Sequence, residues 1–334
     1  MSDRPITQPP EASAKAHFAP EFGQRALLTV DTEEEFDWSG DFSATDHGLK
    51  HVGSIARFQQ FCEELGAAPV YLCDWPITQS AEAVELIGDA VTRGKAEIGI
   101  QLHPWVNPPF DEEVSAYNSY AGNLPPQLER AKFMHLRDEI ERRFDTQPLI
   151  YRAGRYGLGQ DTAELLKDAG VAIDTSVRSN FDYRPGHGPD YRRHPLEPYW
   201  VDAQRELLEL PVTSVFWGML RRQGRLLQPL AAKLPLLPGI LARTGMLERI
   251  ALTPEGVTAS EAIRGIDIAL DDGLPLLVLS FHSPSLAPGY TPYVRSEADL
   301  EALYEWFRQI YAYLARRGVA PTSVKEVMAQ VRRD

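Results

Sequence analysis

The chain has 334 residues, of which 43% are hydrophobic, so it can bury a substantial core as one large domain or two small ones. Its formal net charge of −13 excludes general attraction to nucleic acid, because phosphate binding needs a basic surface. The two cysteines, Cys62 and Cys73, are not in a metal-binding spacing, which excludes a disulfide framework and a thiolate zinc site.

The N-terminal residues are rich in Pro, Ala and charge, and they lack the apolar stretch of a secretory signal. We expect residues 1–22 to be a disordered leader and the protein to be cytoplasmic. The most hydrophobic region, Leu226–Leu241, is interrupted by Gln228, Lys233 and three prolines. The sequence therefore predicts no membrane-spanning helix.

Seven short apolar runs rich in β-forming residues follow the leader, and each is predicted to be a strand. They are Ala26–Asp31, Pro69–Asp74, Ala96–His103, Leu149–Ala153, Val171–Thr175, Leu207–Thr213 and Pro275–His282. Six segments with helical apolar spacing lie between or after them: Leu49–Leu65, Ser80–Arg93, Pro126–Phe144, Gln160–Ala169, Ala259–Asp271 and Glu297–Arg317.

Alternation of strands and helices predicts an α/β fold with a parallel sheet covered by helices. Gly66, Gly94 and Gly170 each fall between a predicted helix and the next strand, where a left-handed residue can end the helix. No internal repeat and no linker is evident. We therefore expect residues 23–334 to form a single domain.

Two stretches interrupt the alternation where a barrel would place elaborate loops. Arg178–Arg205 is aromatic, Arg-rich and turn-prone, and residues 216–250 are apolar and basic. The second stretch contains six basic residues and one acidic residue, a net charge of +5 in a chain whose remainder carries −18. Two interpretations stay open: a lid or membrane-surface patch, and a helical hairpin at a contact between two copies of the chain.

Polar residues stand at the ends of most predicted strands, and in a parallel barrel such ends surround one mouth. They are Asp31, Asp74, His103, Arg152, Asp174 and His282. Carboxylates, imidazoles and an arginine that converge from separate strands have the form of an active site. The alternative for Asp74 is that it only caps the following helix.

Asp31 precedes three consecutive glutamates, and no helical pattern follows that would need a cap. Repulsion among these carboxylates would raise the pKa of a general base. Gln101 and His103 share a strand face by period-two geometry, and Trp105 adds an aromatic wall. His282 ends a fully apolar strand, where an uncompensated imidazole would be unfavourable.

Arg152 lies inside an otherwise apolar strand, so it needs either a buried carboxylate, such as Asp31 or Asp174, or a substrate anion. The nearby glycines, Gly154 to Gly159, match neither a dinucleotide fingerprint nor a Walker loop. No Gly-x-Ser-x-Gly elbow and no Cys–His pair is evident, which disfavours serine or thiol catalysis.

Read together and in order, these segments resemble the NodB-like polysaccharide deacetylases of carbohydrate esterase family four, and in particular the WalW-like branch. The resemblance runs from about Ala26 to Ser285. It rests on Thr29-Val-Asp-Thr-Glu33, Glu97-Ile-Gly-Ile-Gln-Leu-His-Pro-Trp105, Arg152-Ala-Gly-Arg-Tyr-Gly157, Asp174 and Phe281-His-Ser-Pro284.

The resemblance implies a distorted, incomplete (β/α) barrel of about seven parallel strands and hydrolysis of an N- or O-acetyl group on a carbohydrate. It implies that Asp31 is the catalytic base, that His282 is the general acid, and that Arg152 tunes Asp31. The residues expected to bind the sugar are Trp38, Gln101, Trp105, Arg155, Tyr156 and Asp174.

The chain departs from the family where the metal binds. The adjacent Asp-Asp pair of the family is here Asp31-Thr32, and its two-histidine segment is here Gln101 and Trp105 with His103 between them. A zinc-like divalent metal could still bind through Glu33 and His103, or through Asp31, although glutamine is a poor substitute for histidine.

Three functional hypotheses follow. The leading one is a deacetylase-like hydrolase, with Trp75 as a further sugar-stacking candidate. The second is a glycan-binding barrel that has lost the metal, since Thr32 and Gln101 stand where the family has ligands. The third is a glycosidase that uses two carboxylates such as Asp31 and Asp174.

Overall fold

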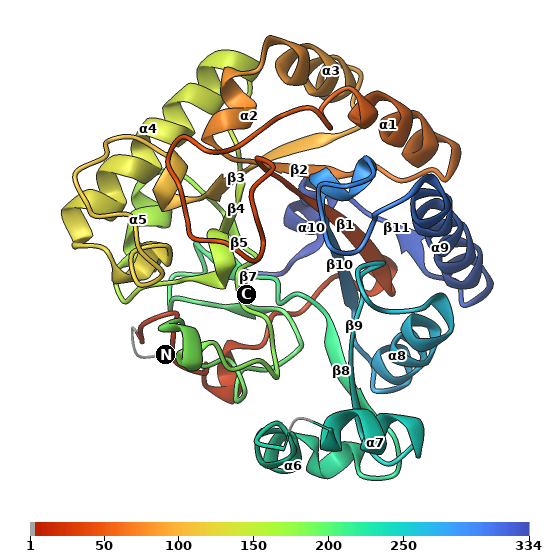
Figure 1. The fold of residues 1–334 in the computed structure, drawn as a ribbon. Helices are drawn as coiled ribbons and strands as arrows, with labels where there is room; N and C mark the ends of the chain where they lie inside the picture. The colour runs from red at the N-terminus through yellow and green to blue at the C-terminus, as the bar shows by residue number, and fades with distance from the viewer. Residues whose placement is uncertain (1–3, 235, 334) are drawn as a thin grey trace.

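The core of the protein is a curled sheet of nine strands, as a computed structural model describes it for residues 4–234 and 236–333 (Figure 1). The strands are β1 (Arg25–Thr32), β2 (Val70–Cys73), β3 (Glu97–Leu102), β4 (Ile150–Ala153), β5 (Ile173–Asp174), β6 (Tyr199–Trp200), β7 (Leu208–Glu209), β10 (Leu276–His282) and β11 (Ala320–Pro321). Their order is β10-β1-β2-β3-β4-β5-β7-β6, with β11 also beside β1.

All seven predicted strands are present and parallel, and they form the continuous part of this sheet. Only β6 is antiparallel to its neighbour among the described strands of the sheet. The strands β10 and β6 form the two edges of the sheet and do not pair with each other there. The expected fold, a distorted and incomplete barrel, is therefore confirmed.

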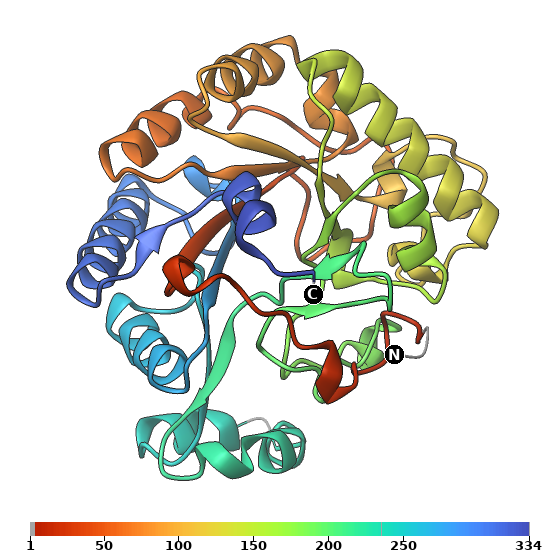
Figure 2. The ribbon, with the colours of Figure 1, turned by 180° about the vertical axis from the view of Figure 1, so that it is seen from behind.

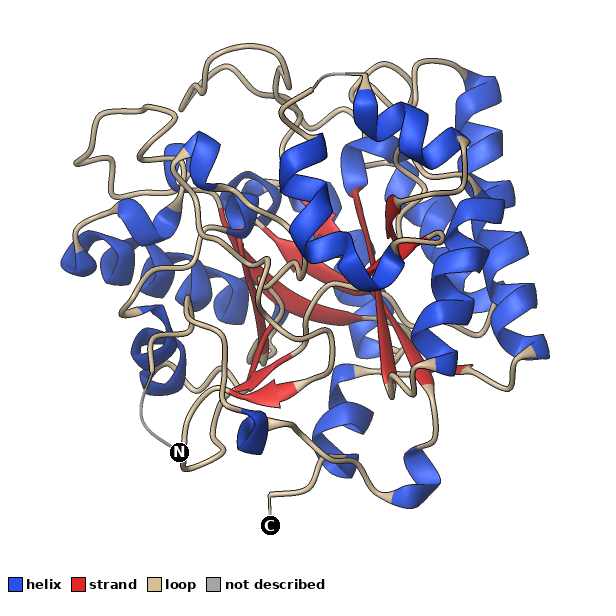
Figure 3. Ribbon diagram, turned by 90° about the horizontal axis from the view of Figure 1, so that it is seen from below, coloured by secondary structure: helices blue, strands red, loops and turns tan. Residues whose placement is uncertain are grey.

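Helices cover the outside of the sheet, and Figure 3 shows the strands enclosed by them. They are α1 (Ser54–Glu64), α2 (Trp75–Gln79), α3 (Ala81–Thr92), α4 (Pro126–Phe144), α5 (Thr162–Asp168), α8 (Ala259–Asp271), α9 (Glu297–Arg316) and α10 (Val324–Gln330). All six predicted helices are confirmed. No helix in the described ranges combines the length and apolar character that crossing a bilayer requires.

Local sequence explains where these helices begin and end. Thr258 and Ser296 each form a capping box at the start of α8 and α9. Gly66, with φ +70°, follows α1, Gly94, with φ +66°, follows α3, and Gly170, with φ +76°, follows α5. Because glycine adopts this left-handed backbone at little cost, each releases the chain into the next strand.

The expectation of a disordered leader is wrong for residues 4–22; residues 1–3 lie outside the described chain. Ile6, Ala14 and Phe22 are buried, and the amide of Ala16 donates to the carbonyl of Pro198. Figure 2 shows this segment running across the back of the barrel. The apolar residues of this segment are few and show no periodicity. They are buried against the sheet and α10, which lie much later in the sequence, so the segment alone does not predict this packing.

The predicted insertion is a hairpin arm. Strands β8 (Ser214–Trp217) and β9 (Glu248–Ala251) pair antiparallel, and α6 (Gly224–Ala231) and α7 (Leu237–Arg243) lie between them. We refer to residues 218–247, of which 235 is not described, as the arm. Figure 1 shows α6 and α7 at the far end of the hairpin, away from the barrel.

Candidate active site

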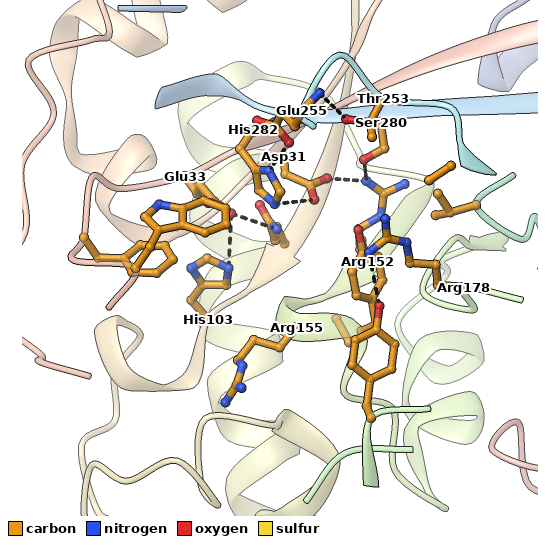
Figure 4. Close-up of a pocket in the computed structure, with 18 of the residues that line it drawn as sticks. Asp31, Glu33, His103, Arg152, Arg155, Arg178, Thr253, Glu255, Ser280 and His282 are labelled. Atoms are coloured by element: carbon orange, nitrogen blue, oxygen red, sulfur yellow. Dashed lines mark hydrogen bonds and ion pairs between the residues drawn. The ribbon is translucent and has the colours of Figure 1, made fainter. Parts of the chain in front are cut away.

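The strand-end residues surround one cavity of about 350 Å³. In the parallel pair β1–β10, Asp31 lies opposite His282, and in the pair β3–β4, Gln101 lies opposite Arg152. Of the predicted site residues, the cavity is lined by Asp31, Glu33, Trp38, Gln101, His103, Trp105, Arg152, Arg155, Tyr156 and His282. Parallel register therefore brings together residues that are up to 251 positions apart (Figure 4).

Arg152 and Asp31 form a buried ion pair at the bottom of the cavity. The same guanidinium donates to the Ser280 hydroxyl at 2.8 Å, to the Thr29 hydroxyl at 2.9 Å and to the Thr175 carbonyl at 3.0 Å. Of the partners that the sequence left open for Arg152, namely Asp31, Asp174 and a substrate anion, the structure shows Asp31. Because each partner of Arg152 lies on a strand or at the end of one, Arg152 holds the Asp31 carboxylate in a fixed orientation.

Asp174 does not line the cavity, contrary to its predicted place among the sugar-binding residues. Its carboxylate accepts from the Ser176 hydroxyl at 2.6 Å and interacts with the buried Glu209. Burial and the neighbouring Asp174 hold the pKa of Glu209 well above its usual range. The two-residue strand β5 directs this side chain toward β7, a neighbour that the sequence pattern does not reveal.

His282 faces Asp31 and is held from behind by Glu255. Its Nε2 lies 3.7 Å from Asp31 Oδ2, and its Nδ1 lies 2.7 Å from Glu255 Oε2. Burial alone lowers the pKa of His282, but the carboxylates of Glu255 and Glu33, followed by Asp31, outweigh it and raise the pKa to about 10. The imidazole is therefore protonated at neutral pH and can donate a proton into the cavity.

His103 presents its Nε2 to the cavity because a carboxylate holds the other ring nitrogen. Its Nδ1 lies 2.9 Å from Glu34 Oε2, and Glu34 Oε1 accepts from the indole of Trp105 at 2.8 Å. A proton on Nδ1, donated to Glu34, would leave the Nε2 lone pair facing the cavity. His103 Nε2 lies 3.4 Å from Glu33 Oε2.

Glu33 and Gln101 carry unsatisfied oxygens beside His103. The Gln101 amide donates to Glu33 Oε2 at 3.2 Å, which leaves Oε1 of both residues buried without a hydrogen-bond partner among the described atoms. Burial raises the pKa of Glu33 to about 8. Buried polar atoms without partners are uncommon in folded proteins, and they indicate a missing ligand.

A second acidic group lies behind His103. Ligand atoms of Glu34, Asp74 and His103 lie within 4.8 Å of one another, so the group could hold a metal ion. Asp74 also accepts from the amide of Ile77 at 3.0 Å and from that of Glu34 at 2.8 Å. The interpretation of Asp74 as a helix cap is therefore confirmed for α2.

The turn after β4 is strained. Arg155 and Tyr156 have φ values of +55° and +61°, a left-handed conformation that non-glycine residues adopt at a cost of about 1–3 kcal/mol each. A Cβ on Gly154 would meet His103 Cδ2 at 2.4 Å and the Leu102 carbonyl at 2.6 Å. Only glycine fits there, and the turn places both following side chains at the cavity.

Aromatic rings form much of the cavity wall. Trp38 packs edge to face on His282 with 4.8 Å between ring centroids, and Trp105 stacks on His103 at 4.3 Å. Trp75 does not line the cavity, contrary to its place as a sugar-stacking candidate: its ring contacts that of His135 on α4 instead. Rings of this kind bind the apolar faces of ligands in concave sites.

Sequence reasoning missed several cavity residues, above all Glu255. It stands in the loop after β9, a strand that the sequence did not predict, so no strand-end rule could find it. Arg178 and Tyr183 also line the cavity from a turn-rich stretch without periodicity. A polar residue in a loop beside an unpredicted hairpin belongs to no periodic pattern, so a single sequence does not identify it as a site residue.

No protein-family model matches the chain, and no curated protein does. Among solved structures, a protein of Parabacteroides distasonis assigned as a glycoside hydrolase/deacetylase is similar over 90% of this chain and 69% of its own, with TM-score 0.58 and 10% identity. A 4-alpha-glucanotransferase of Thermococcus litoralis is similar over 92% of this chain and 40% of its own, with TM-score 0.50 and 11% identity.

A protein of Mycobacterium smegmatis assigned as a polysaccharide deacetylase is similar over 95% of this chain and 98% of its own, with TM-score 0.47 and 18% identity. At such identities a structural likeness establishes the fold and leaves the activity to be argued from the site. The chain thus shares its fold, an incomplete α/β barrel, with the two structures above whose TM-scores are 0.50 or more.

Proposed function

We propose that the chain is a hydrolase that removes an N- or O-linked acetyl group from a sugar or polysaccharide. The observation that carries this proposal is the opposed pair of Asp31 and His282, with 3.7 Å between Oδ2 and Nε2 at one cavity. Each has its own counter-charge, Arg152 for the carboxylate and Glu255 for the imidazole. A base and an acid held apart in this way are what acyl hydrolysis needs.

In the proposed reaction Asp31 accepts a proton from water as the water oxygen attacks the acyl carbon. The tetrahedral intermediate collapses when the bond to the sugar nitrogen or oxygen breaks, and the proton on His282 Nε2 passes to that leaving atom. Acetate and a free amine or hydroxyl result. Arg152 orients Asp31, and Glu255 holds His282 in its protonated form.

The carbohydrate part of the proposal has two supports. The aromatic rings at the cavity, Trp38 among them, suit the apolar faces of a sugar ring. Two of the similar solved structures, those reported above with TM-scores of 0.58 and 0.50, are named as a glycoside hydrolase/deacetylase and a 4-alpha-glucanotransferase. Membership of the WalW-like branch and a cytoplasmic location remain predictions.

A divalent metal fits one face of the cavity. Glu33, Gln101 Oε1 and the Nε2 lone pair of His103 point there, and two of these side chains carry oxygens without partners among the described atoms. Glu34 and Asp74 already accept hydrogen bonds through both carboxylate oxygens and do not line the cavity. We therefore assign Glu33, His103 and Gln101 as the ligands, with Glu34 orienting His103.

A metal bound there would supply Lewis-acid polarisation of the acyl carbonyl. The family's second aspartate has no working counterpart at Thr32, whose hydroxyl donates to the Val30 carbonyl at 2.9 Å and does not line the cavity. That observation favours the second candidate function, a glycan-binding barrel without the metal. The glycosidase hypothesis loses Asp174 as its second carboxylate, because Asp174 lies outside the cavity, whereas Glu33 and Glu255 line it beside Asp31.

The proposal is tested by acetate release from N-acetylated and O-acetylated oligosaccharides. Asp31→Asn and His282→Gln should each lower turnover by at least about 100-fold, the scale of general acid–base catalysis. Matched controls on the outer helix α4, Asp138→Asn and His135→Gln, should leave turnover unchanged. Full turnover in Asp31→Asn would refute the assignment.

Metal content, measured by mass spectrometry on the same preparations, separates the two candidate functions. We expect about one equivalent of metal in the wild type and at least about tenfold weaker binding after Glu33→Gln or His103→Gln. Binding of oligosaccharide without metal and without acetate release would establish the glycan-binding function instead.

A further inference from the structure

Three arginines line the cavity, and two of them lack a carboxylate partner. Arg152 is neutralised by Asp31. Arg155 donates to the Ser119 hydroxyl and the Ala116 carbonyl, and Arg178 donates to the Tyr183 hydroxyl at 3.4 Å. Within the described chain neither of the latter two forms an ion pair. Two guanidinium groups at the cavity therefore have no carboxylate partner among the described residues.

Arg178 shows this imbalance best. Its guanidinium lies 3.9 Å from the ring centroid of Phe181, and that of Arg249 lies 3.5 Å from the same centroid. Arg249 donates to the Asn180 carbonyl and has no carboxylate partner in the described residues either. Two cations that pack on one ring repel each other. Shielding them from water also costs solvation free energy, which only an anion offsets fully.

The Nε of Arg178 is moreover a buried donor without an acceptor in the described chain. Figure 4 shows Arg178 and His103 on opposite sides of the cavity, with Asp31 and Arg152 between them. A sugar that extends across the cavity from the proposed reaction centre would bring a substituent to Arg178. Nitrogen donors of arginine match the oxygens of carboxylate and phosphate.

We propose that the substrate is an anionic acetylated sugar, whose carboxylate or phosphate binds Arg178. This inference rests on the proposed hydrolase function. Arg178 binds the anion with its terminal guanidinium nitrogens, and Arg249 adds long-range attraction. The acidic residues Asp31, Glu33 and Glu255 stay at the side where the acetyl group reacts.

Calorimetry on the Asp31→Asn variant tests this inference without turnover. The probes are N-acetylglucosamine, its C6 carboxylate (the uronic acid) and its 6-phosphate. We expect at least one anionic probe to bind at least about tenfold more tightly than the neutral sugar. Arg178→Met should remove that preference and change the affinity for the neutral sugar by less than about twofold. Arg308→Met, on the outer helix α9, is the matched control.

The outcomes separate the two proposals. If all three probes bind equally to protein with Arg178, or if the preference survives Arg178→Met, the anionic-substrate inference is wrong. If the preference is present but the wild type releases no acetate from any probe, the hydrolase proposal fails and Arg178 is an anion site of a binding protein. Arg178→Lys keeps the charge and, if Arg178→Met does not fold, should retain part of the preference.

A second inference comes from the arm and does not depend on the cavity. Nine large hydrophobic side chains are exposed in the described chain, and six of them belong to the arm. Their exposed fractions are Met219 82%, Leu226 74%, Leu230 59%, Leu234 58%, Leu236 80% and Ile240 52%. A cluster of this size on a solvated protein marks a surface that binds a partner.

The arm is also strongly basic. Residues 218–247 contain five basic residues and no acidic one, whereas the whole chain carries −13. Arg221 pairs with Asp272, which directly follows α8, and Arg225 donates to Asn180 and His194. Among the described residues, no carboxylate forms an ion pair with Arg222, Lys233 or Arg243. Unpaired cations beside exposed leucines favour an anionic, apolar partner.

The two faces of α6 differ in their exposure to solvent. Leu226 and Leu230 lie one turn apart and point outward, whereas Gly224 and Ala231 are buried on the other side. A Cβ on Gly224 would meet the Phe216 ring at 2.3 Å, so the inner face packs closely on β8. The outer face is left free to insert between lipid headgroups.

We infer that the arm docks onto an anionic bilayer surface. A symmetric contact between two copies is the weaker interpretation, because it would place one set of five cations against another. The negative body would be repelled by the same bilayer, so only the protruding arm can make contact. The arm inserts its leucines, and Arg222, Lys233 and Arg243 bind the headgroups.

Co-sedimentation with vesicles tests this inference on the full-length protein. We expect binding to vesicles of phosphatidylglycerol and phosphatidylcholine, little binding to phosphatidylcholine alone, and loss of binding at about 1 M salt, where the Debye length is about 3 Å. Leu226→Ser/Leu230→Ser/Leu236→Ser should weaken binding at least about tenfold. Phe110→Ser/Tyr117→Ser changes exposed aromatics on the barrel and should leave it unchanged.

Sedimentation velocity without vesicles tests the alternative, a contact between two copies of the chain. A dimer of the wild type that becomes a monomer in the triple serine variant, together with absent or unselective vesicle binding, would overturn the inference in favour of self-association. Equal vesicle binding by the wild type and the triple variant would overturn it as well. Arg222→Glu/Lys233→Glu offers a second route, because it reverses charge on exposed residues and should also abolish binding.

Discussion

The floor of the cavity and the tip of the arm differ in whether their charged side chains are paired. At the floor, Arg152 forms a buried ion pair with Asp31, and the partly buried His282 forms a close pair with Glu255. At the tip, cations such as Lys233 stand beside exposed leucines, and no carboxylate lies within the arm. Paired buried charges fix the geometry of a reaction, whereas unpaired exposed ones remain available to an outside partner.

The largest expected effect is at the floor. Arg152→Met leaves Asp31 buried without its cation, so the free energy of unfolding should fall by about 3–5 kcal/mol. Urea denaturation measures this change. Adding Asp31→Asn to Arg152→Met should recover part of the loss, because no unpaired charge then remains. A double variant as unstable as the sum of the two single changes would show that the pair is not coupled.

A glycine in each region sharpens the comparison. Gly154→Ala would drive a methyl group into His103 and the Leu102 carbonyl, so unfolding free energy should fall by about 1–3 kcal/mol and turnover should fall as His103 shifts. Gly239→Ala in α7 meets no atom within 4 Å and should stabilise the arm helix by about 0.5–1 kcal/mol. Equal effects at the two positions would remove the contrast between a packed floor and an open arm.

The sequence predicts the structure correctly where one local pattern determines it. Helices α4 and α8 have the predicted bounds, because apolar periodicity, Pro126 and the cap at Thr258 mark their ends. Parallel register explains why Asp31 and His282 meet. By contrast, β6 and β11 have two residues each and, unlike the equally short β5 and β7, do not lie within one of the longer apolar runs that predict a strand. Glu255 follows the unpredicted β9, so its contact with His282 depends on tertiary structure alone.

Glu255→Gln should change the pH dependence of turnover. His282 is the proposed acid and must be protonated, so activity should fall as pH rises through its pKa of about 10. Removing the Glu255 charge lowers that pKa and moves the alkaline limb of kcat/KM to lower pH. The loss at pH 9 should be about tenfold if the pKa drops by about two units, with little change at pH 6. An unmoved alkaline limb would exclude His282 as the acid. The exposed Glu113→Gln serves as the control.

The smallest expected effect is at the tip of the arm. Leu236 is 80% exposed, so Leu236→Ser should change the free energy of unfolding by no more than about 0.5 kcal/mol. Leu279, which is 1% exposed in β10, is the contrasting position: Leu279→Ala leaves a cavity and should cost about 2–5 kcal/mol. Urea denaturation of both variants decides whether the arm leucines serve the fold. If Leu236→Ser destabilised the chain by several kcal/mol, that leucine would be part of the core, and its exposure would no longer support an outside partner.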